Sequence, residues 1–145
     1  MTQIDFYTHV DDKLRVACVL SAKACGQGLK VFVCCPDPDT ARRFDRMLWT
    51  TPALGFTPHC APGDPLAPVT PVIVDHEGTA PPHDEVLLNL RGEWPPFFSR
   101  FQRLIEIVGL DDGDRAEARD RFRYYRDSGY EIRTHDLSKN VTSDQ

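Results

Sequence analysis

The chain of 145 residues is long enough for one compact domain and leaves little room for a second. Its 41% hydrophobic and 27% charged residues lie near the averages of soluble globular proteins, which excludes collagen-like, coiled-coil and wholly disordered chains. The formal charge of −5 argues against a protein that coats nucleic acid by bulk electrostatics.

A strand followed by a helix is predicted at the start of the chain. Residues 3–7 alternate between apolar and polar side chains, as a half-buried strand does. Asp11 or Asp12 can then cap a helix whose apolar residues recur at helical spacing as far as Ala24. Two glycines follow at the place where a helix C-terminus belongs, and we expect the helix to end there.

A second strand and a second helix are predicted next. The near-continuous apolar run 30–35 is typical of a strand that is covered on both faces. Apolar residues within 41–49 recur at helical spacing and predict a helix. Six prolines and two glycines between residues 50 and 71 then leave little room for regular structure, so this segment is expected to form a long exposed loop.

The second half of the chain continues the alternation of strands and helices. Strands are predicted over 69–75, 85–91 and 130–134, and helices over 95–108 and 115–126. The first of these helices would begin at a pair of prolines. The second is rich in arginine and ends before a glycine.

Strands that alternate with helices favour a three-layer α/β fold, with a mostly parallel sheet flanked by helices, because parallel neighbours need helical crossovers. We expect a single domain over residues 1–137 and a flexible C-terminal tail over 138–145. The fold is Rossmann-like, but the chain has neither a P-loop nor glycines between its first strand and first helix. No nucleotide site and no cofactor are therefore predicted.

The cysteines and acidic residues do not form a recognisable catalytic or metal site. The five cysteines are odd in number and lie mostly in apolar or helical stretches, so they are expected to be reduced thiols. Cys34 and Cys35 lie within an apolar strand, where a thiolate would be costly. Together with His59 and Cys60 they lack the spacing of a zinc site. No catalytic or metal-binding residue is predicted.

The N-terminal segment MTQIDFYTHV lacks the basic and apolar regions of a signal peptide. No apolar run approaches the roughly 18 residues that a membrane helix needs. We therefore expect a cytoplasmic protein without a membrane partner.

The arginine-rich helix sets a basic stripe beside an apolar one. The basic stripe is Arg119, Arg123 and Arg126, at i, i+4 and i+7, and the apolar stripe is Ala118, Phe122 and Tyr125. Such a border suits an acidic peptide with a hydrophobic anchor, because arginine can form paired hydrogen bonds with carboxylates. The alternative is a solvated face with pairs within the helix, such as Glu117 with Arg121.

A second candidate surface is the aromatic and proline-rich stretch that begins at Trp49 and includes Pro52 and Phe56. A large aromatic side chain before such a loop can serve as an exposed anchor. The alternative is that Trp49 packs into the core.

Several motifs together resemble the chi subunit family of bacterial DNA polymerase III. They are I-D-F-Y at 4–7, K-V-F-V-C-C at 30–35, D-x-x-L-W-x-x-P at 45–52, F-x-P-H at 56–59, L-L-N-L-R at 87–91, the phenylalanine-rich stretch through Phe101 and R-x-R-F-R-Y-Y-R-x-x-G at 119–129. No single motif is decisive. Their order and spacing cover residues 3–135, which chance would rarely produce.

The resemblance implies an α/β subunit of a DNA polymerase that has no nucleotide site and is itself non-catalytic. It implies two partners, the psi subunit of the clamp loader and the acidic C-terminal tail of single-stranded DNA-binding protein. By position, the tail-binding surface would be Val108, Arg119, Phe122, Arg123 and Arg126, and the psi-facing surface would include Trp49, Pro52 and Phe56. Family members often have Tyr and Lys where this chain has Phe122 and Arg123, so the positive charge is kept without the hydroxyl group.

The leading hypothesis is an adaptor that contacts DNA only indirectly. The alternative is a small α/β hydrolase or a nucleotide-dependent enzyme, which would require an acid, a base and a nucleophile in one pocket. A direct nucleic-acid binder is a third possibility and would bind bare oligonucleotides with a steep salt dependence.

Overall fold

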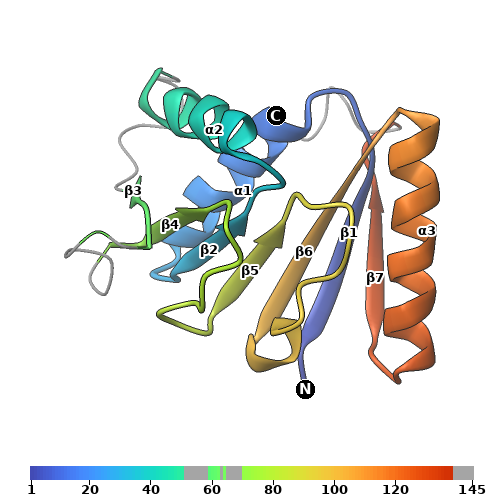
Figure 1. Cartoon of the computed structure of the whole chain (residues 1–145). Coiled ribbons are helices and arrows are strands. Elements are labelled where there is room, and N and C mark those ends of the chain that lie inside the picture. Colours follow the sequence, from blue (N-terminus) through green and yellow to red (C-terminus); the bar gives the residue numbers. More distant parts are fainter. Residues whose placement is uncertain (51–58, 63, 65–69, 139–145) are drawn as a thin grey trace.

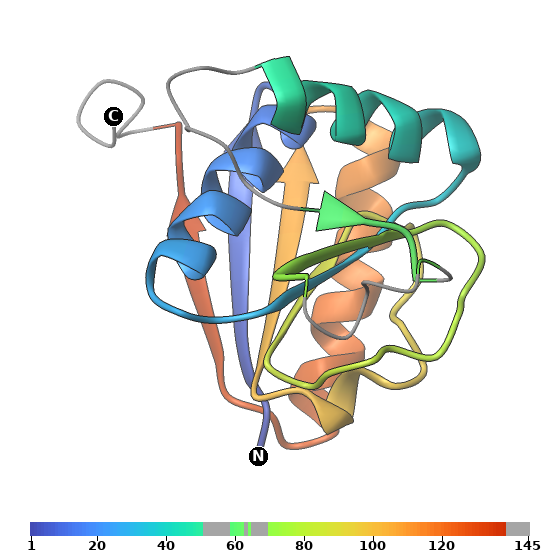
Figure 2. The ribbon, with the colours of Figure 1, turned by 90° about the vertical axis from the view of Figure 1, so that its left-hand side faces the viewer.

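A seven-stranded parallel sheet forms the centre of the computed structural model, which describes residues 1–50, 59–62, 64 and 70–138 (Figure 1). The strand order is β3-β4-β2-β5-β6-β1-β7, and every pairing is parallel. Helices cover both faces of the sheet (Figures 1 and 2). The three-layer α/β architecture predicted from the sequence is therefore confirmed.

The strands are β1 (Gln3–Val10), β2 (Val31–Cys34), β3 (His59–Cys60), β4 (Val72–Asp75), β5 (Val86–Asn89), β6 (Arg103–Gly109) and β7 (Ile132–Asp136). In the described part of the chain the helices are α1 (Lys13–Gly26), α2 (Pro38–Thr50) and α3 (Asp112–Asp127), and a 3-10 turn, η3, lies at Phe98–Arg100. The short strand β3 lies inside the segment for which the sequence predicted only a loop.

The central strands are apolar on both faces because each face packs against a helical layer. In β2, Val31 and Val33 face the layer formed by α1 and α2, whereas Phe32 and Cys34 face α3. Figure 2 shows α1 and α2 in front of the sheet and α3 behind it. This double coverage explains why the run in β2 is continuously apolar instead of alternating.

Capping residues fix the helix ends close to the predicted positions. Asp12 accepts a hydrogen bond from the backbone N–H of Arg15 at 3.2 Å, which selects it over Asp11 as the cap of α1. Asp111 caps α3 in the same way. Gly129 follows α3 with φ of +91°, a conformation that glycine adopts without strain.

The prediction of a helix over residues 95–108 is wrong. The structure has the turn η3 and then strand β6, which lies between β5 and β1. Strand β6 is a central strand whose residues from Leu104 onward are buried, so its apolar residues do not alternate. Together with the phenylalanines before the strand, the apolar residues of β6 happen to recur at helical spacing. Glu106 also interrupts the apolar run that would have indicated a strand.

A buried carboxylate, Asp5, joins the three strands at the β7 edge of the sheet. Its side chain is fully buried and accepts hydrogen bonds from Nε of Arg103 at 2.9 Å and Nε of Arg133 at 3.0 Å. Nε2 of His135 lies 3.0 Å away. Burial by itself raises the pKa of Asp5, but the hydrogen bonds from His135, Arg103 and Arg133 lower it to about 2.

The Asp5→Asn variant is therefore expected to lose about 2 kcal/mol of unfolding free energy near pH 7. Because the pKa of Asp5 is lower in the folded state than in the unfolded state, its ionised form stabilises the fold above about pH 4. This contribution disappears as the pH falls towards 2. Urea unfolding of both proteins between about pH 7 and about pH 2 measures the difference in unfolding free energy between wild type and Asp5→Asn. This difference should shrink at low pH, and a constant difference would contradict the stabilising role of ionised Asp5.

Candidate functional site

Strands β1 and β6 are neighbours, but the helices that follow them lie on opposite faces of the sheet. Strand β1 leads into α1, and β6 leads into α3. Where neighbouring parallel strands send their connections to opposite faces, a crevice opens beyond their carboxyl ends. Ligands of open α/β sheets bind at such positions more often than elsewhere.

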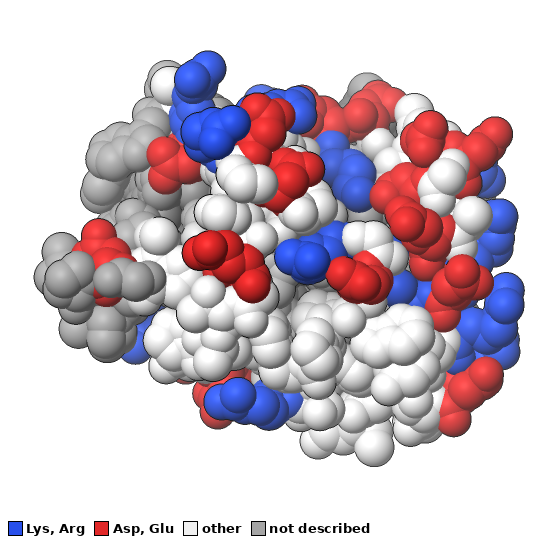
Figure 3. All heavy atoms as spheres, in the orientation of Figure 1, with Lys and Arg blue, Asp and Glu red and all other residues white. Residues whose placement is uncertain are grey.

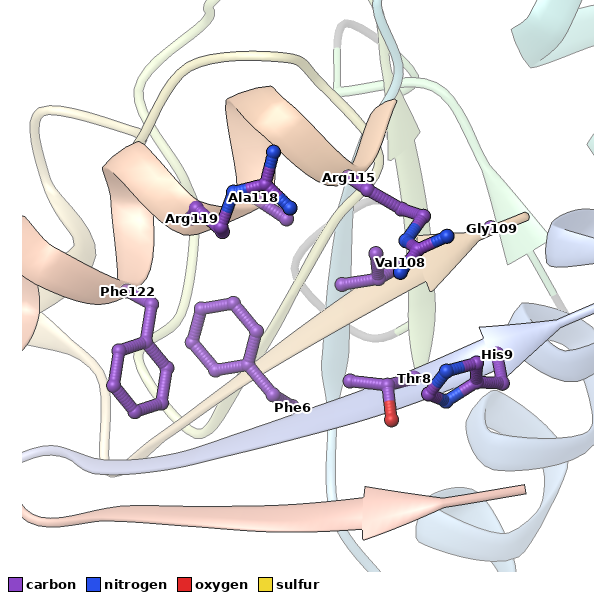
Figure 4. A pocket seen from close by; sticks show the side chains of 9 residues that line it. All are labelled: Phe6, Thr8, His9, Val108, Gly109, Arg115, Ala118, Arg119 and Phe122. Atoms are coloured by element: carbon purple, nitrogen blue, oxygen red, sulfur yellow. The ribbon is translucent and has the colours of Figure 1, made fainter. Parts of the chain in front are cut away.

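A pocket of about 200 Å³ lies at this position, between the two strand ends and α3 (Figure 4). Its apolar walls are Phe6, Val108, Ala118 and Phe122, and its remaining lining residues are Thr8, His9, Gly109, Arg115 and Arg119. The rings of Phe6 and Phe122 meet edge to face, with centroids 5.4 Å apart. The pocket can therefore take an apolar group next to positive charge.

The positive charge of the pocket comes from α3. Arg115 and Arg119 are one helical turn apart and extend over the same pocket from α3 (Figure 4). Arg115 is about half exposed and has only a long contact, 3.9 Å, with Asp112. Arg119 is exposed and has no ion-pair partner among the residues that the structure describes. Both guanidinium groups are available to an anionic ligand.

Three of the five residues expected at the tail-binding surface line this pocket: Val108, Arg119 and Phe122. The other two, Arg123 and Arg126, are exposed on α3 and do not line it. Arg123 lies 3.8 Å from Asp120, and Arg126 lies 3.2 Å from Asp127. Acidic and basic side chains are intermixed over α3 in Figure 3, as in a solvated helix face.

Arg115 and the β1 residues of the pocket were not among the residues expected from the sequence. Helical spacing could have found Arg115, because it lies four residues before Arg119 and seven before Phe122 on one face of α3. Phe6, Thr8 and His9 carry no comparable signal. They reach the pocket only because β1 pairs with β6 about 100 residues along the chain.

The residues expected at the psi-facing surface fall largely outside the described part of the chain. The backbone of Trp49 belongs to the last turn of α2. Pro52 and Phe56 lie outside the described residues. Their proposed role remains an expectation from the sequence.

A buried ion pair anchors α3 to the sheet behind the pocket. Nε of Arg121 donates to Glu106 at 3.0 Å, and both side chains are at most 2% exposed. The carboxylate also accepts hydrogen bonds from the hydroxyl of Tyr125 at 2.6 Å and from Nδ2 of Asn89 at 3.0 Å. Burial raises the pKa of Glu106, while Arg121, Tyr125 and Asn89 act in the opposite direction.

This pair corrects the interpretation of Arg121 as part of a solvated face. Arg121 pairs with Glu106 and also donates from Nη1 to the carbonyl of Gly92 at 2.8 Å. The side chain of Arg121 points away from that of Arg123 and faces the sheet instead of the solvent. Arg121 is therefore a structural residue of α3.

Cys18, Cys25, Cys34 and Cys35 are free thiols, and burial makes Cys18, Cys34 and Cys35 poor nucleophiles. Burial raises the pKa of Cys18 and Cys35 to about 12, and it raises the pKa of Cys34 as well. Across residues 1–50, 59–62, 64 and 70–138, no group of three or more His, Cys, Asp or Glu residues is placed to hold a metal ion. No helix in this part of the chain is long and apolar enough to cross a membrane.

Alkylation with iodoacetamide near pH 8 is expected to modify half-buried Cys25 before Cys18, Cys34 and Cys35. The thiolate is the reacting form, and burial suppresses it strongly in Cys18, Cys34 and Cys35. Peptide mass spectrometry of the native protein measures the order of labelling. Rapid labelling of Cys34 or Cys35 in the folded protein would contradict the conclusion that burial makes these thiols unreactive.

Comparisons with known proteins point to one family. The family model described as "DNA polymerase III chi subunit, HolC" matches residues 1–133. A Pseudomonas aeruginosa protein named DNA polymerase III subunit chi is 36% identical over 144 residues, which is 96% of this chain and 99% of that protein. Proteins of the same name from Escherichia coli and Haemophilus influenzae are 28% and 29% identical, and each alignment covers more than four fifths of both chains.

Proposed function

The chain belongs to the DNA polymerase III chi subunit family, and on this premise we propose that it is a non-catalytic adaptor in DNA replication. In this role it links the clamp loader, through the psi subunit, to the C-terminal tail of single-stranded DNA-binding protein. It contacts DNA only indirectly.

The observation that carries the proposal is the pocket in which Arg115 and Arg119 border an apolar wall. The family resemblance implies a tail that is acidic and ends in Pro-Phe. A terminal phenylalanine would place its ring in the pocket, against the apolar wall that includes Phe6 and Phe122, where burial of apolar area is favourable. Its α-carboxylate and the preceding acidic side chains would accept hydrogen bonds from the two guanidinium groups.

The psi subunit is proposed to bind a different part of the molecule. Helix α2 ends at Thr50 and leads into the segment with Pro52 and Phe56. Helix α2 packs on the sheet face opposite α3 (Figure 2), and this separation of α2 from the pocket supports a second, independent surface. An adaptor needs two surfaces that can be occupied together.

Affinity purification of the tagged chain from cell extract, with mass spectrometry, separates the possible functions. The adaptor function requires recovery of both single-stranded DNA-binding protein and clamp-loader subunits, psi among them. Excess tail peptide should then elute single-stranded DNA-binding protein and leave psi bound. Recovery of neither protein would overturn the proposal, as would release of both by the peptide.

The alternative functions predict other behaviour. A hydrolase or nucleotide-dependent enzyme would turn over generic esters or nucleotides. A direct nucleic-acid binder would show binding to bare oligonucleotides that weakens steeply with salt. The net charge of −5 disfavours the second of these.

A further inference from the structure

His9 has a backbone conformation that residues other than glycine rarely adopt, with φ of +57°. The register between β1 and β6 is regular as far as Tyr7 and resumes at Val10, so His9 lies in an irregularity of the strand. Its side chain lines the pocket from the strand side, beside Thr8 (Figure 4). Strained residues concentrate at binding sites, where the surrounding structure holds them in place.

An ion-pair partner holds the His9 ring at the pocket. Nδ1 of His9 lies 3.0 Å from Oδ1 of Asp136, at the end of β7. The same oxygen accepts hydrogen bonds from the backbone N–H of Ser138 at 3.0 Å and from its hydroxyl at 2.6 Å. The His9 side chain is 42% exposed, so it can exchange protons with solvent.

The net charge at this end of the pocket depends on the protonation of His9. With a neutral ring, His9 and ionised Asp136 carry one negative charge, which repels an acidic ligand. With a protonated ring the pair is neutral. The other charged groups at this end of the pocket are Arg115 and Arg119 on α3, Asp112 at 3.9 Å from Arg115, and the Lys13–Asp114 ion pair beside Gly109. Asp11 and Asp12 follow His9 along the chain, before α1.

We infer, on the basis of the proposed tail-binding role, that His9 is a specificity-determining residue that makes the pocket favour acidic C-terminal peptides more strongly when its ring is protonated. Histidine is the side chain that ordinarily changes charge between pH 5 and 8. The carboxylates of the peptide and the arginines of the pocket keep their charges over this range. Removing one negative charge near the ligand is expected to tighten binding about threefold.

Calorimetry with a peptide ending in Asp-Ile-Pro-Phe, at about pH 6 and about pH 8, tests this role. Wild type should bind about threefold more tightly at the lower pH. His9→Asn keeps a residue that tolerates positive φ but cannot be protonated, and it should lose this dependence. His9→Lys should bind at the higher pH about as tightly as wild type does at the lower pH.

The matched control is His135→Gln. His135 is also close to a carboxylate, Asp5, but on the opposite face of the sheet, and its replacement should leave the pH dependence intact. Calorimetry near pH 7 in buffers of different ionisation enthalpy should show proton uptake on binding by wild type and not by His9→Asn. Equal affinity of wild type at both pH values, or a pH dependence that persists in His9→Asn, would overturn the role of His9 and leave tail binding standing. Absence of binding at both pH values would overturn the tail-binding function itself.

Discussion

Replacing Arg121 with methionine is expected to lower the free energy of unfolding by about 3–5 kcal/mol. The substitution keeps much of the apolar volume of the side chain but leaves Glu106 buried without its cationic partner. Tyr125 and Asn89 still donate hydrogen bonds to the carboxylate, but neither carries a positive charge. Urea unfolding near pH 7.5 measures the loss.

Arg123→Met is the matched control on the same helix. Its side chain is 60% exposed and makes only a 3.8 Å contact with Asp120, so we expect a change within about 0.5 kcal/mol. Adding Glu106→Gln to Arg121→Met removes the unpaired charge and should recover part of the loss. Equal effects at Arg121 and Arg123 would contradict the importance of the buried pair.

The loss in Arg121→Met should also depend on pH. Burial already raises the pKa of Glu106, and removing Arg121 raises it further. A folded-state pKa above the unfolded value means that the folded variant takes up a proton more readily, so its stability falls as the pH rises. The difference in unfolding free energy between wild type and Arg121→Met should therefore be larger at about pH 8 than at about pH 5.5. A difference that becomes smaller as the pH rises would contradict this explanation.

Reversing the charge of Arg119 is expected to weaken binding of the acidic tail peptide at least about 30-fold. The change removes a charge-assisted hydrogen bond, worth about 1.5–3 kcal/mol, and adds repulsion of the ligand. Arg119 lines the pocket and has no ion-pair partner among the described residues, so its replacement should leave folding intact. Calorimetry with a peptide ending in Asp-Ile-Pro-Phe measures the loss.

Two exposed arginines serve as controls for Arg119→Glu. Arg123 lies on the same helix but outside the pocket lining, and Arg42 lies on α2, on the other side of the sheet; each is replaced with glutamate. Both should weaken binding by less than about threefold, through screened long-range repulsion. Equal losses at Arg119 and Arg42 would show that net charge, and not the pocket, holds the peptide.

The alternation of strands and helices was largely predictable from the sequence because each element carries a local signal. The buried run of β2 and the cap at Asp12 are of this kind. Strand β6 was not predicted as a strand because Glu106 interrupts its apolar run. An acidic residue within an apolar segment could instead have indicated a buried ion pair, since a buried carboxylate requires a partner.

Residue spacing predicted only the helical side of the candidate site, whereas Val108 on β6 followed from the family resemblance. The arginine-rich helix was identified, but spacing alone did not decide which of its faces meets the sheet. The buried positions of Ala118, Arg121 and Tyr125 settle the orientation, and they bring Arg115 to the pocket while Arg123 and Arg126 stay outside its lining. The strand side depends on pairing between distant segments, for which a single sequence carries no local signal.

Calorimetric titration of the wild-type protein with two tail peptides tests the adaptor function most directly. One peptide ends in Asp-Ile-Pro-Phe, and the other is identical but lacks the terminal phenylalanine. If the pocket at Phe6 and Phe122 holds the ring while Arg115 and Arg119 hold the carboxylates, the complete peptide binds one to one and the shortened peptide binds at least about tenfold more weakly. Equal affinities for the two peptides, or no binding of either, would contradict tail recognition by this pocket.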